Sequence, residues 1–495
     1  MDERRHVSQV VMPLRGINRR ECLTALVKTA ILAPALLSSS RIAADAPFPP
    51  LPHLPESEAL LLTPRDSRFA HYQPAYNRRT MLEPKLRAIC KTPGAVKTMI
   101  QWLRSHRLLF AMRSGGHSFE GLSQSDSVVI DTRMLNAIDI DTANETVTVG
   151  AGASLGNIYK AVGARGYALS AGSCPTVGVA GHALGGGYGL LSRQFGLLCD
   201  SLKSLEIADP DGRIIGADLH QNADLFWASR GGGGGCFGIA TRLGFQVFPL
   251  SQVAVFSIDW LLPAARARSV VKVWQAWAPQ APEAITSALK ISMGARGRIS
   301  LQCLGQSVGS EAQLRQELRG LIEADATQRA PRVRPTSFLQ AIDHFSEGWR
   351  YESTYSKDKS DFVLSPLSDD GIATLIEGLQ YIGAGGFTVV LYAYGGAIGR
   401  IPSQDTAFPY RNAIGCIQYN VIWQRPAMTR VRLSQMRRLY GSMRPYVSGA
   451  AYVNYCDSEL QNWGEAYWGP NLPRLKAIKS RFDPDNVFRH AQSIW

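Results

Sequence analysis

Short apolar runs separated by turns rich in Gly and Asp follow one another along residues 63–250. Strand-like runs of aliphatic and β-branched residues lie near 109–112, 127–131 and 146–149. Apolar residues at helical spacing lie near 95–106 and 154–164. Thr92 and Ser154 are good N-cap residues, so helices are expected to begin at them. This part of the chain predicts mixed sheets with helices beside them.

Beyond Val253 the pattern changes, because longer amphipathic helices alternate with single strand-like runs. The helical segments lie near 264–277, 311–323, 370–381 and 428–440, and the strand-like runs near 298–304, 387–393 and 413–423. Helices that cover one face of an antiparallel sheet give this pattern. After Tyr446 the elements become short again, and the last helix is expected at 472–481. Together the patterns predict an α+β fold.

Residues 1–46 have the pattern of a targeting signal rather than of a folded element. Arg19 and Arg20 precede an apolar stretch, 22–37, that is too short and too interrupted to span a membrane. We expect a twin-arginine export signal that directs a folded protein to the periplasm or the exterior. A disordered basic tail is the alternative. Residues 47–62 form a Pro-rich lead that is expected to run extended, and no other segment predicts stable membrane insertion.

Length, charge and cysteine spacing narrow the class of protein. The 495 residues suffice for about two domains. The formal charge of +13 is spread along the chain without a block of Lys and Arg, which argues against a nucleic-acid partner. The eight cysteines form no CxxC pair and have no His at metal-ligand spacing, which argues against a metal site and a disulfide framework. The sequence does not indicate the oligomeric state.

Three Gly-rich segments follow apolar runs and predict turns that bind phosphate. They are Arg113-Ser114-Gly115-Gly116-His117-Ser118, the stretch from Cys174 to Gly189, and Gly231–Gly238. Backbone N–H groups in such turns bind anions, and Arg113 can add a charge-assisted contact. A Rossmann unit matches poorly, because no strand-GxGxxG-helix is followed by the required acidic residue. Three such turns in one region favour a large phosphate-bearing cofactor over three unrelated loops.

The same segments resemble the berberine-bridge-like, FAD-linked oxidases of the vanillyl-alcohol-oxidase fold, and the expected export signal suits a bacterial member. Further matches are Phe408-Pro409-Tyr410-Arg411, Ile417-Gln418-Tyr419, Tyr452–Asp457 and Phe482-Asp483-Pro484 with Phe488. They keep the family's order from about residue 63 to the C-terminus, which is more specific than any single motif. The resemblance implies an FAD domain in two parts, 63–252 and 447–495, with a substrate domain inserted at 253–446.

By the same resemblance, FAD is attached covalently at two points. His117 would bond the 8α-methyl carbon of the isoalloxazine, and Cys174 its C6. Imidazole and thiolate are nucleophiles suited to such bonds, and two tethers leave the ring open to a bulky substrate. The other residues that the resemblance brings to the cofactor are Arg113, Ser114, Gly115, Gly116, Ser118, Val177, Gly178, Gly181, His182, Gly185, Gly186, Tyr188, Gly189, Gly238, Ile239 and Asn454.

A hydride leaves an alcohol carbon when a base takes the hydroxyl proton. The resemblance assigns this base to Tyr455, gives Gln418 the role of orienting substrate or flavin, and makes Tyr392 the second phenol of a tyrosine pair. Core packing is an equal alternative for Tyr392. Cys416 stands where many plant members have a Lys that stabilises a phenolate, which leaves the identity of the base open. Cys236 likewise replaces a usual Asn.

The leading prediction is an oxidase that converts the anomeric hydroxyl of a mono- or oligosaccharide to a lactone and gives hydrogen peroxide from O2. Val177 lies at a position associated with oxygen access, where a small side chain favours an oxidase over a dehydrogenase. Candidates for exposed aromatics that stack on sugar rings are Trp349, Tyr351, Tyr394 and Trp423, although core packing is the better expectation for most of them. The alternatives are oxidation of an alkaloid, polyketide or phenolic, a dehydrogenase with another acceptor, and a binding protein that has kept the fold.

Overall fold

The computed structural model describes residues 48–325, 327, 330–346 and 354–495. The expected export signal lies outside the described residues, as do Trp349 and Tyr351. The chain divides into two compact units, Met1–Pro50 and Leu51–Trp495. Only residues 48–50 of the first unit are described, and every described helix and strand belongs to the second.

Four strands form the first sheet, in the order β1-β2-β4-β3. They are Ala59–Leu62 (β1), Leu86–Cys90 (β2), Phe110–Arg113 (β3) and Val128–Asp131 (β4). β2, β4 and β3 are parallel, whereas β1 pairs antiparallel with β2. β1 begins inside the expected Pro-rich lead, because four apolar residues there join the sheet and become largely buried. Helix α3 (Pro93–Ser105) follows β2 and begins as expected, where Oγ1 of Thr92 accepts from the amide of Ala95.

A second sheet is antiparallel throughout and has the order β5-β6-β10-β8-β9. Its strands are Ile138–Asp141 (β5), Thr146–Gly150 (β6), Leu202–Ala208 (β8), Ile214–Ala217 (β9) and Ile239–Gln246 (β10), and Tyr167–Ala168 (β7) pairs separately with Phe248–Pro249 (β11). The helices of this region are Phe69–Tyr72 (α2), Leu155–Gly163 (α4), Val179–Leu184 (α5), Ser192–Phe195 (α6) and Ala223–Ala228 (α7). Buried side chains of the sheet and of α4, α5 and α7 share one apolar core.

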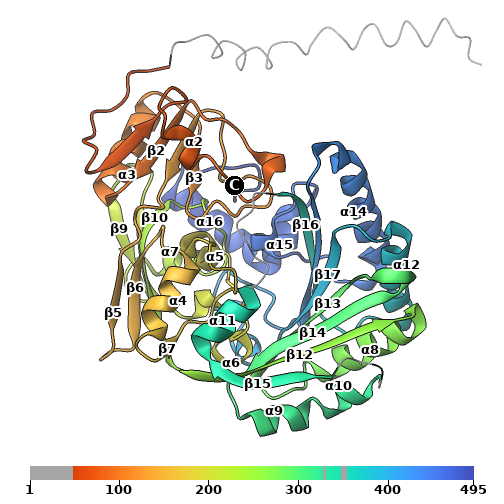
Figure 1. Ribbon diagram of the computed structural model, residues 1–495. Helices are drawn as coiled ribbons and strands as arrows, with labels where there is room; N and C mark the ends of the chain where they lie inside the picture. Colours follow the sequence, from red (N-terminus) through yellow and green to blue (C-terminus); the bar gives the residue numbers. More distant parts are fainter. Residues whose placement is uncertain (1–47, 326, 328–329, 347–353) are drawn as a thin grey trace, which may run out of the picture. The chain divides into compact units, whose positions relative to one another are not determined.

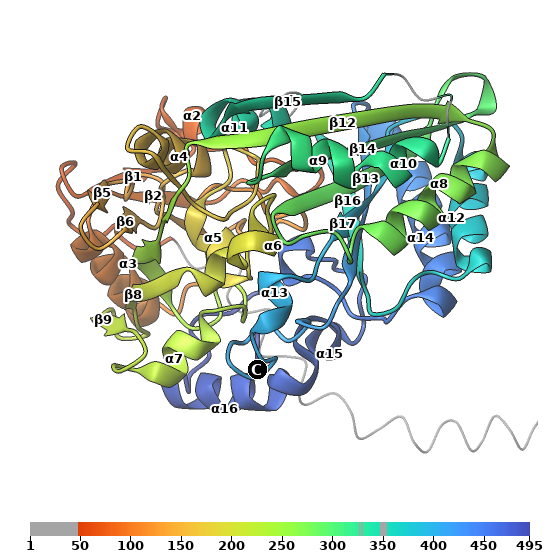
Figure 2. The same cartoon turned by 90° about the horizontal axis from the view of Figure 1, so that it is seen from below.

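Seven antiparallel strands form the third sheet, in the order β15-β12-β14-β13-β17-β18-β16. They are Gln252–Leu262 (β12), Ile285–Met293 (β13), Ile299–Ser307 (β14), Arg332–Ser337 (β15), Tyr355–Val363 (β16), Phe387–Ala393 (β17) and Gly415–Trp423 (β18). Helices Ala264–Trp277 (α8), Asp369–Ile382 (α12) and Thr429–Met443 (α14) cover one face, as Figures 1 and 2 show from two directions. A large apolar core fills the layer between these helices and the sheet, so the opposite face is left for a ligand.

The expected α+β fold is confirmed, and the helices expected at 264–277, 370–381 and 428–440 are present as α8, α12 and α14. The helix expected at 311–323 is instead two helices, Glu311–Glu317 (α9) and Arg319–Glu323 (α10). The remaining short helices are Phe338–Ser346 (α11) and Ala397–Arg400 (α13). Strands β12, β13, β15 and β16 go beyond the prediction. β16 carries four charged residues and yet is almost entirely buried, because residues distant in the sequence satisfy those charges.

Residues 447–495 return to the region built by β1 to β11. Their helices are Trp463–Trp468 (α15) and Leu472–Phe482 (α16), and α16 packs against α7. Nε1 of Trp468 donates to the carbonyl of Gly231 at 3.2 Å, and the buried Nζ of Lys479 donates to the carbonyl of Cys236 at 2.6 Å. The C-terminal residues therefore pack against the first part of the chain and complete that region. No helix of the described part is long and apolar enough to cross a membrane.

Candidate active site

A cavity of ≈ 580 Å³ lies among the Gly-rich turns, the loop at 452–456 and the uncovered face of the seven-stranded sheet. It brings together residues that are far apart in the sequence. The expected site residues that line it are Arg113, Ser114, Gly115, Gly116, His117, Ser118, Cys174, Val177, Gly178, Gly181, His182, Tyr188, Gly189, Gly238, Ile239, Tyr392, Gln418, Asn454 and Tyr455.

His117 and Cys174 both line the cavity and both contact the hydroxyl group of Thr176. Nε2 of His117 is 3.0 Å from Oγ1 of Thr176, and Sγ of Cys174 is 3.5 Å from the same oxygen. Tyr76 stacks on the imidazole, with ring centroids 5.1 Å apart. Burial, with a smaller effect of Arg113, lowers the pKa of His117 to about 4. The imidazole is therefore neutral at neutral pH and able to act as a nucleophile.

The glycines of the turns do two different things. Gly115 and Gly178 let two turns touch, because a Cβ on Gly115 would lie 2.2 Å from the backbone N of Gly178. Gly181 and Gly234 instead leave space open. A Cβ on Gly181 would meet no protein atom within 4 Å, and one on Gly234 would first meet Cα of Gly181 at 3.6 Å. Backbone without side chains on the cavity side, in helix α5 at Gly181 and in the turn at Gly234, fits a large phosphate-bearing cofactor such as FAD.

Arg113 holds the structure together rather than presenting a free charge to the cavity. It is only 3% exposed. Its guanidinium donates to the carbonyl of Gln73 at 3.3 Å and to that of Pro74, and its Nε is 3.6 Å from the carboxylate of Asp131. These partners give the guanidinium a structural role, and its contact with a phosphate stays a prediction.

Gly185 and Gly186 lie behind the cavity lining rather than in it, contrary to the prediction. A Cβ on Gly185 would come 2.0 Å from Oδ1 of Asn454, so this glycine allows the C-terminal loop to approach α5 closely. Nδ2 of Asn454 donates to the carbonyl of His182 at 2.9 Å. Burial lowers the pKa of His182 to about 4, and its Nε2 accepts a 2.9 Å hydrogen bond from the amide of Gly172. These contacts position the turn that carries Cys174.

A chain of hydrogen bonds runs from the cavity into the seven-stranded sheet. Tyr455 and Tyr392 both line the cavity, and the hydroxyl of Tyr455 acts on the pKa of Tyr392. The hydroxyl of Tyr392 donates to Oε1 of Gln418 at 3.0 Å, and Nε2 of Gln418 donates to Oδ1 of Asp358 at 2.8 Å. Asn420 donates to the same oxygen of Asp358 at 2.9 Å. Tyr392, Gln418 and Tyr455 were expected in the site, but Asp358, which is fully buried on β16, was not.

Burial sets the protonation of this chain. It raises the pKa of Tyr455 well above the ordinary value of a phenol. It also raises the pKa of Tyr392, although the hydrogen bond from Tyr455 opposes the shift. At Asp358 burial raises the pKa to about 7, against the effect of the two amides that donate to it. Both phenols are therefore neutral at neutral pH, while the carboxyl group titrates there.

The aromatic residues around these phenols belong to a packed core. Tyr188 lines the cavity, but its hydroxyl donates to the carbonyl of Ala393 at 3.0 Å. Its ring stacks on Tyr394, with centroids 4.9 Å apart and planes 3° from parallel. Tyr394 is 1% exposed, and Trp423 is 4% exposed within the core beneath the helices. Tyr394 and Trp423 are therefore core residues and do not stack on sugars, in line with the core packing expected for most of these candidates, because apolar neighbours cover both rings.

Polar side chains of the seven-stranded sheet form the floor of the cavity, and the sequence analysis missed them. They are Ser257, Lys290, Gln302 and Arg332. Lys290 pairs with Val390, which pairs with Gln418. Lys290 therefore lies two strand spacings, about 10 Å, from Gln418 on the same face. Burial lowers the pKa of Lys290. A lysine within an alternating strand gives the same sequence signal whether it faces solvent or a ligand, so no local pattern reveals this floor.

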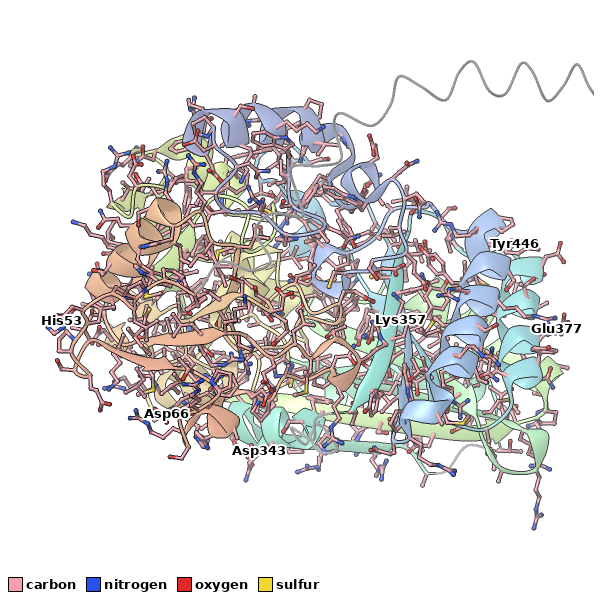
Figure 3. The ribbon with its side chains drawn as sticks, turned by 90° about the horizontal axis from the view of Figure 1, so that it is seen from above. His53, Asp66, Asp343, Lys357, Glu377 and Tyr446 are labelled. Atoms are coloured by element: carbon pink, nitrogen blue, oxygen red, sulfur yellow. The ribbon has the colours of Figure 1, made fainter. Side chains whose placement is uncertain are left out.

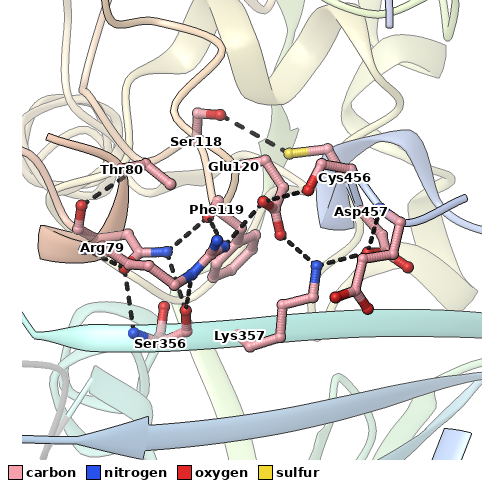
Figure 4. Close-up of polar contacts among 12 residues, drawn as sticks. Arg79, Thr80, Ser118, Phe119, Glu120, Ser356, Lys357, Cys456 and Asp457 are labelled. Carbon is pink, nitrogen blue, oxygen red and sulfur yellow. Dashed lines mark hydrogen bonds and ion pairs between the residues drawn. The ribbon is translucent and has the colours of Figure 1, made fainter. Parts of the chain in front are cut away.

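Buried ion pairs fasten the two loops of the site to β16, as Figure 4 shows. Nζ of Lys357 lies 2.5 Å from carboxylate oxygens of both Glu120 and Asp457, and all three side chains are nearly inaccessible. Figure 3 shows Lys357 inside the body of the molecule. Glu120 belongs to the loop that follows His117, and Asp457 to the loop that follows Tyr455. The network thus holds both loops at one strand.

The two cysteines that depart from the family's pattern are buried. Cys416 pairs with Tyr392 across β18 and β17, and Sγ of Cys236 lies 3.7 Å from Nε2 of His490. The described cysteines are all free thiols. Across the described ranges no three His, Cys, Asp or Glu side chains are arranged to hold a metal ion.

Comparisons with known proteins agree with this architecture. Two family models match: an FAD binding domain over residues 84–218 and a berberine and berberine like domain over residues 451–495. The FAD-linked oxidoreductase YgaK of Bacillus subtilis is 36% identical over 83% of this chain and 91% of its own length. The monolignol oxidoreductase AtBBE-like 13 of Arabidopsis thaliana is 31% identical over 81% of each chain. The solved structure of Physcomitrella patens BBE-like 1 matches with a TM-score of 0.83 at 28% identity, over 89% of this chain and 97% of that one.

Proposed function

This chain belongs to the berberine-bridge-enzyme-like family of FAD-linked oxidoreductases, and we propose that it oxidises the anomeric hydroxyl of a mono- or oligosaccharide to a lactone. FAD, when bound, supplies the hydride acceptor and the route to O2, which leaves as hydrogen peroxide. His117 and Cys174 would hold it covalently, and helix α5 at Gly181 and the turn at Gly234 would receive its phosphate-bearing part.

The protein's own task is to take the substrate's hydroxyl proton as the hydride leaves the carbon. The ring of Tyr455 contacts Phe119 in the loop that follows His117, with ring centroids 5.9 Å apart, and its oxygen would receive this proton. Because burial keeps both phenols neutral, Tyr455 can accept it only as its own proton passes to Tyr392. The proton of Tyr392 in turn follows its hydrogen bond to Gln418.

The polar floor of the cavity is the observation that carries the saccharide proposal. A sugar ring presents hydroxyl groups on every edge, and each one needs a hydrogen-bond partner when it leaves water. Ser257, Lys290 and Gln302 supply donors and acceptors on the same face of the sheet as Gln418. Ser257 and Gln302 also hydrogen-bond Asp259, so an apolar alkaloid would leave chiefly the ammonium group of Lys290 without a partner, which weakens that alternative.

A phenolic alcohol is the second candidate substrate. The monolignol oxidoreductase among the relatives favours it, as do the aromatic rings of Tyr188, Tyr392 and Tyr455 on one side of the cavity. For the electron acceptor, the small side chain of Val177 at the cavity wall supports O2 over an alternative acceptor.

A peroxide assay with the flavin-loaded protein in air tests the proposal. The panel contains monosaccharides, oligosaccharides and phenolic alcohols, each with and without an artificial electron acceptor. Peroxide formed with a sugar, together with the corresponding lactone, is the expected result. Turnover of phenolic alcohols alone would overturn the substrate assignment. Sugar oxidation that requires the artificial acceptor would keep the substrate but make the protein a dehydrogenase.

A further inference from the structure

We propose that Asp358 is the final acceptor of the substrate's hydroxyl proton and that it acts through the amide of Gln418. The inference rests on the proposed oxidation of a CH–OH group at Tyr455, but not on which alcohol is oxidised. It assigns a base to a site in which Cys416 stands where a lysine would stabilise a phenolate.

The direction of the hydrogen bonds supports this transfer. The carboxylate of Asp358 can only accept, so Gln418 must turn its Nε2 toward it, at 2.8 Å. Oε1 of Gln418 therefore faces the hydroxyl of Tyr392, which donates to it at 3.0 Å. The single proton of Tyr392 is thus committed to Gln418, and its oxygen can accept from Tyr455. Each donor points away from the cavity and toward Asp358.

The transfer balances atom by atom. The substrate's O–H bond breaks and its proton bonds to Oη of Tyr455, whose own proton moves to Oη of Tyr392. The proton of Tyr392 moves to Oε1 of Gln418, and one Nε2 proton of Gln418 moves to Oδ1 of Asp358. Gln418 is left transiently as the imidic acid tautomer. It returns to the amide when the transfer runs backward after the product leaves: Asp358 gives its proton to Nε2, Oε1 gives its proton to Tyr392, Tyr392 gives one to Tyr455, and Tyr455 releases one to solvent. The carboxylate becomes a neutral carboxyl group, and the hydride leaves separately with its electron pair.

The setting of Asp358 is costly for a residue that only packs. It is fully buried, and its Oδ2 has no hydrogen-bond partner. Its neighbours on the strand, Lys357 and Lys359, bind Asp457 instead. A neutral side chain would fill the same position without the cost of an incompletely solvated charge. Burial raises the pKa of this carboxyl group to about 7. It is therefore partly ionised at neutral pH and can accept a proton there, whereas both phenols are neutral.

The groups that act on Asp358 from the elements around it are few. Lys357 from its own strand favours its ionised form, whereas Glu120 from the loop after His117 opposes it. The charge of Asp358 also acts on Tyr76 and Tyr392. Burial is the main cause that raises the pKa of both phenols, and the negative charge of Asp358 adds to the rise. Since Asp358 must be ionised to accept a proton, the rate of the reaction should fall as the pH drops through about 7.

The test compares Asp358→Asn and Gln418→Leu, singly and together, with Asp361→Asn as the matched control. Asp361 lies on the same strand, is equally buried, and has a pKa that burial raises to about 7. It binds Arg444 on the other side of the sheet. The measurements are kcat, KM and flavin content from pH 5 to 9, with the best alcohol found in the peroxide screen, and the solvent deuterium isotope effect on kcat.

Asp358→Asn should lower kcat by about 10²-fold or more and change KM little. It should also remove the fall in rate below about pH 7 (the acid limb). The part of the solvent deuterium isotope effect on kcat that comes from several protons moving together should disappear as well. The double variant should be no slower than Gln418→Leu alone, because both residues act in one chain. Asp361→Asn should keep the acid limb. Wild-type kcat and acid limb in Asp358→Asn, or additive effects in the double variant, would overturn the proposal. If Asp358→Asn loses its flavin, Gln418→Leu takes its place in the test, and a wild-type kcat and acid limb in that variant would overturn the proposal. If only phenolic alcohols are oxidised, the saccharide proposal fails, but the role of Asp358 can still be tested with the best phenolic substrate.

Discussion

Gly185 and Asn454 lie so close together that a Cβ on the glycine would sit 2.0 Å from the side-chain oxygen of the asparagine. The contact joins the end of α5, which follows the Cys174 turn, to the loop that carries Tyr455. Both halves of the site therefore depend on one position where no side chain fits. Both residues were expected to bind the cofactor. The role of Gly185 is instead to have no side chain, which leaves room for the side chain of Asn454.

Replacing Gly185 with Ala should therefore weaken the fold and disturb the site. The added methyl group meets Oδ1 and Cγ of Asn454, and such overpacking costs about 1–3 kcal/mol. We expect a lower Tm and a lower kcat together. Gly441→Ala on α14 is the control, because its Cβ would meet nothing within 4 Å and Ala favours the helix. A Gly185→Ala protein with unchanged Tm and activity would contradict this account of the contact.

The two proposed tethers predict a distinctive behaviour of the denatured protein. Wild type, His117→Ala and Cys174→Ala should each stay yellow after acid precipitation, since at least one covalent bond to the flavin remains. Only the double variant should release the flavin into the supernatant. The absorbance of pellet and supernatant measures this directly. Release of the flavin from the wild type would rule out covalent attachment at either residue.

Sequence patterns predicted much of the fold, because the signals that they use are local. The apolar spacing of residues 264–277, 370–381 and 428–440 is the spacing of a helix that covers a sheet, and these helices are present. Strand β16 was not predicted, because its sequence from Tyr355 to Val363 contains charged residues where a buried strand normally has apolar ones. The partners that make its burial possible, such as Glu120 and Asp457, lie about 100 and more residues away.

The same limit applies to the site. His117, Cys174 and Tyr455 stand in unusual turns that a sequence comparison can align. Asp358 and Lys290 stand in ordinary strands, and only the pairing of those strands brings them to the cavity. The sequence therefore indicated the cofactor loops and the phenols but not the groups behind and beneath them.

Loss of the phenol at Tyr455 or Tyr392 should slow the reaction without weakening substrate binding. Phe at either position interrupts the chain that ends at Gln418, so we expect kcat to fall about 10²–10⁴-fold with KM nearly unchanged. Stopped-flow reduction of the flavin under nitrogen isolates this step from reoxidation. Tyr394→Phe, which keeps the ring that stacks on Tyr188, is the control. Equal rates in all three variants would exclude both phenols from the chemistry.

Lys357→Met should destabilise the protein strongly, because it leaves Glu120 and Asp457 buried without a common partner. Breaking a buried pair costs about 3–5 kcal/mol, whereas an exposed pair is worth about 1 kcal/mol or less. Lys272→Met, which breaks the exposed pair with Asp369, is therefore the control. Denaturant unfolding at pH 7 should separate the two variants clearly, and similar losses of stability in both would contradict the structural role of the buried network.

The pH dependence of that loss follows from the two pKa shifts. Burial alone would raise the pKa of Asp457, but Lys357 and Lys359 lower it below its ordinary value of 3.8. Burial alone would lower the pKa of Lys357, but Asp457 and Glu120 raise it above 10.5. The stabilisation by Asp457 is lost as the pH falls through its lowered pKa, and that by Lys357 as the pH rises through its raised pKa. The difference between wild type and Lys357→Met should be full at neutral pH and shrink at both extremes.

Lys290 should decide how the cavity treats a charged sugar. Its Nζ has no hydrogen-bond or ion-pair partner among the described residues, and it lies about 10 Å from Gln418 across the cavity floor. A carboxylate on the sugar would pair with it, and a hydrogen bond to a charged group is worth about 1.5–3 kcal/mol. We expect kcat/KM for a uronic acid to exceed that for the neutral sugar by about tenfold or more in the wild type and in Lys290→Arg, but not in Lys290→Met. Because burial lowers the pKa of Lys290, the preference should fade as the pH rises through that pKa in the wild type and persist in Lys290→Arg. A preference that survives in Lys290→Met would show that another group recognises the carboxylate.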